Sequence, residues 1–283
     1  MAYDMKGARV LVTGASSGIG RSLVRLAAGQ GARVIAVGRS EVRLNDLVRE
    51  LPGAEIVPVV GDVTRPEDRQ RMLDAAVQRF GGLDVLVNNA GVASFGHFST
   101  STEEVMRQVM EVNFFAPAEL MRLAIPLLTQ GRHPAIVNVA SMCGRRGVPA
   151  WPEYSASKFA LCGLNDALRA EFARFDVDVL LIVPGLTQTS LRENLLHNTG
   201  RLKIDFEEGM KPEVVAEGIL RALRKRRRET VLGWEARWIL RVNRWLPWLV
   251  DRLMARKVRK LYEQEARGGL ASARLHGQTQ VQR

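Results

Sequence analysis

The sequence has few cysteines and no long apolar run. Its only cysteines are Cys143 and Cys162, which cannot form a disulfide framework and are typical of a reducing compartment. No run of about 18 apolar residues occurs, so we expect no membrane-spanning segment. The first apolar stretch is short and continues into glycines, which argues against a signal peptide. We therefore expect a cytoplasmic protein.

Repeats, low-complexity segments and convincing linkers are also missing. We expect no bound metal. Residues 225–228 are all basic, but no recognised nucleic-acid motif accompanies them, so a nucleic-acid partner is not expected. The content of 46% hydrophobic and 25% charged residues is ordinary for a globular protein. A chain of 283 residues is long enough for one large domain.

The positive charge is concentrated near the C-terminus. Residues 221–260 contain 14 of the 41 Lys and Arg residues but only 3 of the 30 acidic residues. The net charge of +11 therefore belongs to this part of the chain, and the remainder is neutral.

Short apolar runs alternate with helical patterns. Strands are predicted at 8–13, 33–38, 55–60, 83–87, 135–140, 177–183 and 230–233, and helices at 21–29, 41–50, 66–80, 102–128, 154–175 and 212–227. Such alternation demands a parallel sheet covered on both faces. We therefore predict an α/β fold with a doubly wound parallel sheet in one domain, residues 1–233. A C-terminal amphipathic helical extension, 234–266, and a disordered tail, 267–283, follow it.

A glycine-rich turn separates the first predicted strand from the first predicted helix. Gly14, Gly18 and Gly20 have the spacing G-x-x-x-G-x-G, which differs from the usual dinucleotide fingerprint G-x-G-x-x-G. A strand, a glycine turn and a helix together direct backbone N–H groups at a phosphate. The alternative is a glycine turn that binds no ligand.

The end of the second predicted strand bears on which dinucleotide binds. An acidic residue there would bind a free ribose 2′-hydroxyl, whereas an arginine suits a 2′-phosphate. Arg39 directly follows the end of this strand at Gly38, and no acidic residue occurs before Glu41. The pattern favours NADP(H) over NAD(H), although Arg39 could also be a solvated charge at a helix start.

The segment 141–158 contains a candidate acid–base group. Tyr154 and Lys158 are four residues apart, so on a helix both side chains project from one face. Free tyrosine has a pKa of about 10, and a neighbouring positive charge favours the phenolate. We expect Lys158 to lower the pKa of Tyr154, and Ser141 to donate a second hydrogen bond to the same substrate oxygen.

Taken together in this order, the motifs closely resemble the classical short-chain dehydrogenase/reductase family over about residues 6–233. The matching elements are Thr13 to Gly20, Asp62-Val63, Asn88 to Gly91, Asn113, Ser141, Tyr154, Lys158 and Pro184-Gly185 through Thr189. The resemblance implies a Rossmann-type sheet. It also implies hydride transfer between nicotinamide and a carbonyl or alcohol carbon, in an enzyme that forms a homo-oligomer, a dimer or tetramer.

The resemblance implies a role for each matched residue. Tyr154 would be the general acid/base, Lys158 would hold the nicotinamide ribose, Ser141 would orient the substrate oxygen, and Asn113 would hold a water of a proton relay. The cofactor would be bound by Gly14, Ser16, Ser17, Gly18, Ile19, Gly20, Arg39, Asp62, Val63, Asn89, Ala90, Gly91, Tyr154, Lys158, Pro184, Gly185, Thr187 and Thr189.

The segments expected around the substrate are apolar. They are 94–98, 142–151 and a lid-like stretch, 186–211, and they contribute Phe95, Phe98, Met142, Val148, Trp151, Leu191, Leu195 and Leu196. This set favours a lipophilic carbonyl or alcohol. Arg145 and Arg146 belong either to a solvated turn or to a site for an anionic head group.

The C-terminal extension carries a helical stripe of apolar residues. Trp234, Trp238, Val242, Trp245, Leu249 and Leu253 recur at steps of three and four, among many arginines, and Pro247 should kink or divide the helix. A basic, tryptophan-rich amphipathic helix is typical of the interface of an anionic membrane. We expect residues 234–260 either to bind such a membrane at its inner face or to dock on protein.

Our interpretation is an NADP-preferring oxidoreductase acting on a lipophilic ketone, aldehyde or secondary alcohol, such as a steroid, a retinoid or a long-chain keto lipid. Two alternatives stay open at this point. One is a soluble 3-oxoacyl-thioester reductase, and the other is a non-enzymatic NADP-binding scaffold.

Overall fold

We describe the protein from a computed structural model, which describes residues 4–189, 191, 195–200 and 207–260. The predicted tail, 267–283, lies outside the described residues, as do parts of the stretch 186–211 and the last residues of the predicted extension.

The strands predicted between residues 8 and 233 form one parallel sheet. Within the described residues its members are β1 (Arg9–Thr13), β2 (Arg33–Gly38), β3 (Ile56–Val60), β4 (Val85–Asn88), β6 (Ala135–Val139), β7 (Asp178–Pro184) and β9 (Glu229–Leu232). Their order across the sheet is β3-β2-β1-β4-β6-β7-β9. The chain proceeds outward from β1 to β3 and then returns to place β4 beside β1. Such a reversal opens a crevice at the carboxyl ends of the strands.

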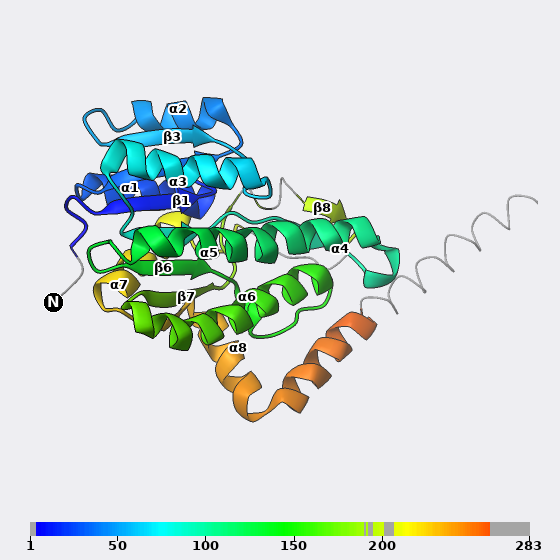
Figure 1. Cartoon of the computed structure of the whole chain (residues 1–283). Coiled ribbons are helices and arrows are strands. Elements are labelled where there is room, and N and C mark those ends of the chain that lie inside the picture. The colour runs from blue at the N-terminus through cyan, green and yellow to red at the C-terminus, as the bar shows by residue number, and fades with distance from the viewer. Residues whose placement is uncertain (1–3, 190, 192–194, 201–206, 261–283) are drawn as a thin grey trace, which may run out of the picture.

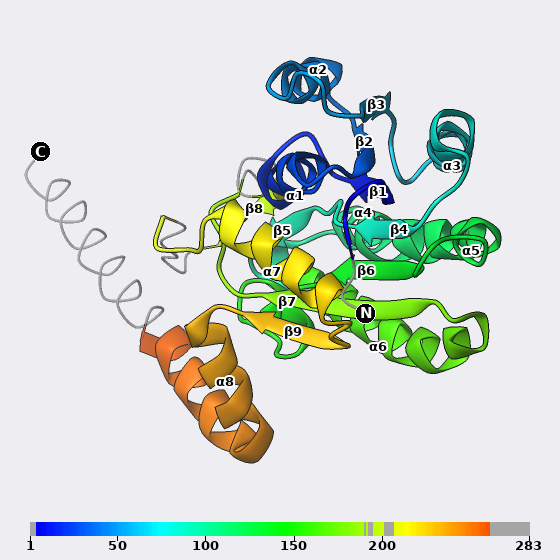
Figure 2. The ribbon, with the colours of Figure 1, turned by 90° about the vertical axis from the view of Figure 1, so that its left-hand side faces the viewer.

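Helices cover both faces of the sheet, as Figure 2 shows. The α-helices of the described residues up to Trp245 are α1 (Gly18–Gly29), α2 (Glu41–Arg49), α3 (Pro66–Phe80), α4 (Glu103–Met110), α5 (Ala116–Leu128), α6 (Pro152–Glu171), α7 (Pro212–Arg224) and α8 (Trp234–Trp245). Apolar residues of α1, α2 and α7 pack on one face, and those of α3, α5 and α6 pack on the other. The sequence prediction of a doubly wound α/β domain is confirmed.

The helix predicted over 102–128 is interrupted. Between α4 and α5 lies a π-helical turn, η2 (Glu111–Phe115), in which the N–H of Ala116 bonds to the carbonyl of Glu111. Pro117 has no N–H to offer the carbonyl of Asn113, so an α-helical bond cannot form there. Such π-turns occur frequently at functional sites, and this one contains Asn113.

Two short strands were not predicted. β5 (Ala93–Phe95) and β8 (Leu195–Asn198) pair in parallel as a separate two-stranded sheet (Figure 2). Each has four residues or fewer, too few for an alternating pattern to stand out in the sequence.

The C-terminal part forms a pair of helices, α8 and residues 247–260, which we call the C-terminal helix pair. Leu246 separates the two helices, and the second begins at Pro247 (Figures 1 and 2). The sequence predicted a break at this proline. Ala236 and Val250 are buried, and Leu240 packs on the body. Among the helices in the described residues, none is long and apolar enough to cross a membrane.

Candidate active site

A cavity of about 790 Å³ lies at the carboxyl ends of the parallel strands. Of the residues predicted for the site, those that line it are Gly14, Ser16, Ser17, Gly18, Ile19, Arg39, Asp62, Val63, Asn89, Ala90, Gly91, Ser141, Tyr154, Lys158, Pro184, Gly185, Thr187 and Thr189. The fold therefore brings together motifs that are far apart in the sequence. Gly20 and Asn113 lie behind the wall and support it.

The glycine turn leaves no room for side chains. Gly14 has φ +67°, and a Cβ there would lie 2.9 Å from the Cα of Ala90. A Cβ at Gly20 would lie 2.2 Å from the carbonyl oxygen of Gly14. Backbone N–H groups therefore face the cavity without covering side chains at the point where α1 begins. This geometry suits a phosphate.

Thr13 and Asn89 fix this turn to the neighbouring strand. The hydroxyl oxygen of Thr13 accepts from the N–H groups of Asn89 and Ala90 at 3.0 and 3.1 Å. The amide of Asn89 donates to the carbonyl of Thr13 at 2.9 Å. The two turns at the switch point therefore act as one rigid unit.

Two arginines follow the end of β2. Arg39 lines the cavity as predicted, and so does Arg43, which the sequence analysis did not single out. Both are exposed, and Arg43 lies in the first turn of α2, whose cap is Ser40. The four-residue spacing, across a predicted helix start, is the signal that could have found it.

Tyr154 is almost completely buried beneath the cavity wall. Burial raises the pKa of its phenol, the nearby Cys143 thiol adds to the rise, and a hydrogen bond with Ser141 opposes it. The expectation that Lys158 would lower this pKa is therefore wrong for the protein alone, because the cost of burying a phenolate dominates. The Lys158 Nζ lies 5.7 Å from the centre of the Tyr154 ring.

Lys158 is buried in the same wall. Burial lowers the pKa of its ammonium to about 8, while Cys162 and Cys143 oppose the change. Its Nζ donates to the carbonyl oxygen of Val139 at 3.1 Å. Tyr154 and Lys158 thus both titrate away from their ordinary values, which is typical of functional sites.

Asn113 is held rigidly by its neighbours. Its side chain accepts from the N–H of Val92 at 3.0 Å and donates to the carbonyl of Val92 at 2.9 Å. The same amide donates to the hydroxyl of Ser157 at 2.9 Å. A Cβ at Gly91 would lie 3.2 Å from its Oδ1 and 3.6 Å from the Lys158 Nζ. Asn113 therefore links the π-turn to helix α6 directly behind Lys158.

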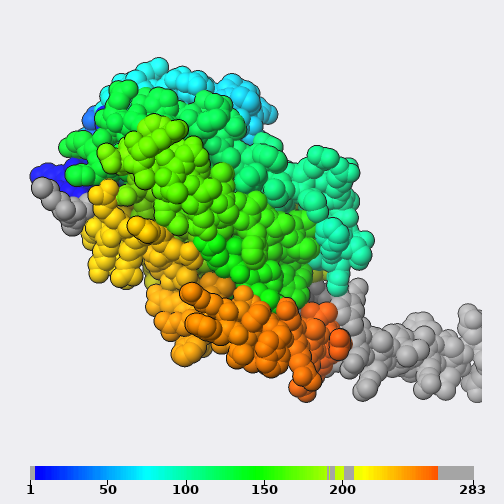
Figure 3. Space-filling view, turned by 60° about the horizontal axis from the view of Figure 1, so that its bottom comes forward, coloured from blue at the N-terminus to red at the C-terminus, as the bar shows by residue number. Residues whose placement is uncertain are grey.

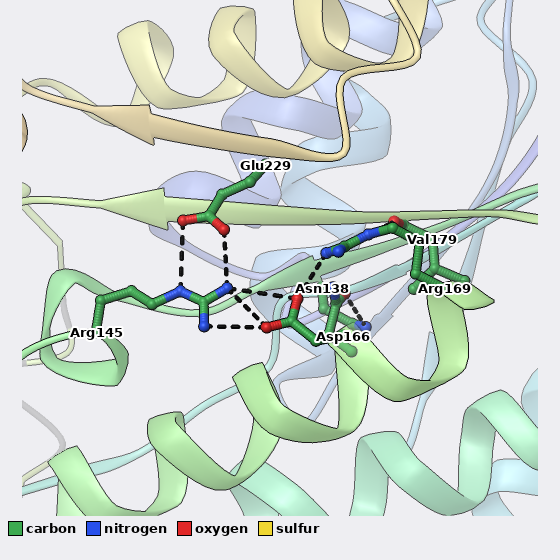
Figure 4. A network of polar contacts seen from close by, with 7 residues as sticks. Asn138, Arg145, Asp166, Arg169, Val179 and Glu229 are labelled. Carbon is green, nitrogen blue, oxygen red and sulfur yellow. Dashed lines mark hydrogen bonds and ion pairs between the residues drawn. The ribbon is translucent and has the colours of Figure 1, made fainter. Parts of the chain in front are cut away.

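The loop after Ser141 is anchored to the body by Arg145 (Figure 4). Its guanidinium donates to Glu229 at 2.8 Å and to Asp166 at 3.2 Å. Asp166 also accepts from Arg169 at 2.7 Å. Arg145 is thus a structural anchor, neither of the two roles left open by the sequence.

The substrate end of the cavity is apolar. Met142, Val148, Trp151 and Leu191 line it as predicted, together with Leu186, Val92 and Val112. The other predicted residues do not: Phe95 is buried under Trp151, with ring centres 4.9 Å apart, and Phe98 is exposed. Leu195 packs on the Phe95 cluster, and Leu196 is only partly buried. The β5–β8 pairing, invisible in the sequence, places them there.

Two further residues of the wall come from the C-terminal helix pair. Glu235 of α8 and Lys257 of the second helix line the same cavity as Tyr154. No sequence signal predicts this contact, because these residues are about 80 and about 100 positions beyond Tyr154.

The model of the short chain dehydrogenase family matches residues 8–200. The chain belongs to this family. It is 36% identical over 256 residues to the uncharacterized oxidoreductase YxnA of Bacillus subtilis, covering 88% of this chain and 72% of YxnA. It is 34% identical to dehydrogenase/reductase SDR family member 7B of Bos taurus, covering 90% of this chain and 83% of that protein.

Solved structures of family members have the same fold. A short chain dehydrogenase/reductase from Burkholderia phymatum in complex with NAD has a TM-score of 0.79 at 26% identity, covering 86% of this chain and 94% of its own. A short chain dehydrogenase from Burkholderia cenocepacia in complex with NADP has a TM-score of 0.75 at 28% identity, covering 89% and 99%. The protein is an oxidoreductase that acts on CH–OH or C=O groups and has the nucleotide-binding fold of its family.

Proposed function

We propose that the protein is an NADP-preferring oxidoreductase for a lipophilic ketone, aldehyde or secondary alcohol. One observation carries the proposal. A single cavity has two arginines at the end of β2 and an apolar wall beside the Ser141–Tyr154 pair.

The residues present fit a dinucleotide phosphate. A Cβ at Gly14, Gly18 or Gly20 would press on neighbouring protein atoms, so only glycines let the turn pack this closely and leave its backbone N–H groups facing a phosphate. Arg39 and Arg43 would hold a ribose 2′-phosphate, because planar guanidinium groups match phosphate oxygens. Asp62 and Val63, with Asn89 to Gly91, would contact the adenosine side, and Pro184, Gly185, Thr187 and Thr189 the nicotinamide side. When bound, this cofactor supplies or accepts the hydride.

The chain's own residues would move the proton. With its pKa raised, the phenol of Tyr154 is protonated at neutral pH and can donate to the oxygen of a carbonyl as it is reduced. The hydroxyl of Ser141 bonds to that phenol and would orient the same oxygen. Lys158 would hold the nicotinamide ribose, and Asn113 would fix the water path behind it.

The substrate end suits a molecule with little charge. Met142, Val148 and Trp151 form the wall nearest Ser141 and Tyr154. Arg145 and Arg146 are both engaged in ion pairs with the protein. Neither guanidinium is then left to recognise the phosphate of a carrier-bound thioester, which favours a free lipid over the 3-oxoacyl thioester.

We also propose that the C-terminal helix pair attaches the protein peripherally to an anionic membrane, at the inner face. It contacts the body through Ala236 and Leu240, whereas most of the tryptophan stripe stays exposed. Trp238 and Trp245 stay 58% and 77% exposed, and Arg241 and Arg244 lie over their rings. Exposed tryptophans interleaved with arginines suit the headgroup region of such a membrane.

A homo-oligomer, dimer or tetramer, completes the proposal. Phe115 and Phe159 are large apolar side chains that are half-exposed on η2 and α6. Burying them against a second copy would remove apolar surface from water. Light scattering of the purified protein gives its mass in solution, and a monomer at micromolar concentration would contradict this part.

The experiment for the main proposal is NADPH oxidation with a panel of steroids, retinal, long-chain keto sphingoid bases and 3-oxoacyl thioesters. Turnover of a free lipid carbonyl is expected. Activity confined to the thioester would contradict the proposed substrate class in favour of the soluble alternative.

A further inference from the structure

The C-terminal helix pair is packed directly on the reacting end of the cavity. Besides the lining residues Glu235 and Lys257, Ala236 approaches the loop after β7. A Cβ at Gly185 would lie 3.0 Å from the Cβ of Ala236. Figure 3 shows the helix pair, in orange, lying along the body. The pair is therefore part of the cavity wall as well as a candidate membrane anchor.

Arg146 joins the helix pair to the catalytic loop. It lies between Ser141 and Tyr154 in the sequence, and its side chain is only 16% exposed. Its Nη1 donates to the Oδ1 of Asn243, on α8, at 3.1 Å. Its Nη2 pairs with the carboxylate of Asp251, on the second helix, and lies 3.7 Å from the Sδ of Met254. One guanidinium thus contacts both helices.

The neighbouring Arg145 fixes the other side of this connection. Its ion pairs with Asp166 and Glu229 hold the loop on α6 and β9. Since the loop is anchored to the body, the contacts of Arg146 hold the helix pair in place rather than the loop.

Burial makes these contacts of Arg146 important. Among the described residues, its Nε is buried with no hydrogen-bond partner, so the charge depends on Asn243 and Asp251. Removing the partners of a buried charge destabilises far more than the loss of an exposed pair. The closed helix pair supplies the two partners of the Nη1 and Nη2 groups of Arg146.

We propose that Arg146 is a positioning residue that holds the C-terminal helix pair as a wall of the substrate end, and thereby controls access to Tyr154. The inference rests on the proposed function for the identity of the substrate, but the closure itself does not depend on it.

Cys143 reports the closure without any substrate. It lines the cavity beside Ser141, whereas Cys162, the other cysteine, is only 1% exposed. Reaction of the full-length protein with N-ethylmaleimide, followed by mass spectrometry of the labelled peptide, measures access to Cys143. A Cys143→Ser variant identifies the signal.

Two variants open the wall from opposite sides. Arg146→Ala removes the guanidinium, and Asn243→Ala/Asp251→Ala removes its partners without touching the loop. In both variants N-ethylmaleimide should react with Cys143 at least roughly tenfold faster than in the wild type, the smallest factor that the loss of one charged hydrogen bond produces in a closed–open equilibrium. Arg259→Ala, an exposed change on the same helix, should label like the wild type. Faster labelling with Arg146→Ala but not with the helix-side variant would overturn the proposal, because the loop alone would explain it.

Steady-state kinetics with retinal as the probe gives an independent readout. Arg146→Ala should raise KM for retinal several-fold and leave kcat and the Kd of NADPH within about twofold, since a positioning wall acts on substrate binding. An unchanged KM together with faster labelling would overturn the role in substrate access. If the wild type reduces no carbonyl of the panel, the proposed function fails, while the labelling comparison still decides the closure.

Discussion

The ammonium group of Lys158 donates to the backbone carbonyl of Val139 at 3.1 Å, which ties helix α6 to the end of strand β6. The side chain of this lysine is 4% exposed, and burial lowers its pKa to about 8. The lysine is therefore held in place at an energetic cost, and that cost depends on pH.

The cost should appear in the stability of the cofactor-free protein. The folded-state pKa of about 8 is below the ordinary lysine value of 10.5, so between these values the unfolded state binds more protons and stability rises with pH. Below pH 8 the full cost is present. Relative to Lys158→Met, the wild type should gain about 2 kcal/mol between about pH 7 and pH 9.5 in urea unfolding. If the free energy of unfolding changes with pH in the same way in the wild type and in Lys158→Met, burial does not lower the pKa of Lys158.

Tyr154→Phe should abolish turnover and leave NADPH binding nearly intact. Loss of a general acid reduces rates by about 10²- to 10⁴-fold, and the ring is retained for packing against Trp151. Turnover and NADPH fluorescence titration measure the two effects separately. Substantial residual activity would exclude Tyr154 as the proton donor.

Arg39→Asp and Arg43→Asp should each reverse or erode the preference for NADPH over NADH. A charge-assisted hydrogen bond to phosphate contributes about 1.5–3 kcal/mol, so each change should lower the ratio of kcat/KM values about 10- to 100-fold. Arg49→Asp is the matched control, because Arg49 is exposed on the same helix and pairs with Asp46. If the ratio does not move in either variant, the 2′-phosphate is recognised elsewhere.

Gly20→Ala should destabilise the fold by more than about 2 kcal/mol and weaken NADPH binding. The added Cβ would lie 2.2 Å from the Gly14 carbonyl oxygen, so the turn must move. Gly29→Ala is the control, since nothing lies within 4 Å of its Cβ position, and it should be neutral or stabilising by up to about 1 kcal/mol. Equal stability of both variants by thermal unfolding would refute the tight turn.

Trp238→Ser/Trp245→Ser should lose binding to anionic phosphatidylserine vesicles and keep the thermal stability of the wild type. Both side chains are exposed, so the docked face is untouched. Truncation after Gly233 is a less clean test, because it also uncovers the surface of the body that Ala236 and Leu240 contact. Co-sedimentation of the double variant as complete as that of the wild type would exclude the tryptophan face as the membrane contact.

Much of the fold could be predicted from the sequence because each strand of the main sheet is an apolar run between clear stops. The phosphate turn was also predictable, since the roles of Gly14 and Gly20 depend on local chain geometry. Arg39 could be placed because it follows a strand end directly.

What could not be predicted depends on burial and on distant contacts. The rise in the pKa of Tyr154 comes from desolvation, which a four-residue spacing to Lys158 does not reveal. The pairing of β5 with β8 moved Phe95 away from the cavity. Of the two possibilities left open for the tryptophan stripe, docking on the body is not the one observed, because the body contacts Ala236 and Leu240 instead.

The most direct test of the central claim is deuterium transfer from NADPH labelled at the reactive nicotinamide carbon to a lipophilic carbonyl such as retinal. Our account predicts that the alcohol formed with labelled NADPH carries one deuterium and that the alcohol formed with unlabelled NADPH carries none. The Tyr154→Phe variant should yield no product. NADPH that binds tightly but transfers no deuterium to any lipophilic carbonyl of the panel would contradict it.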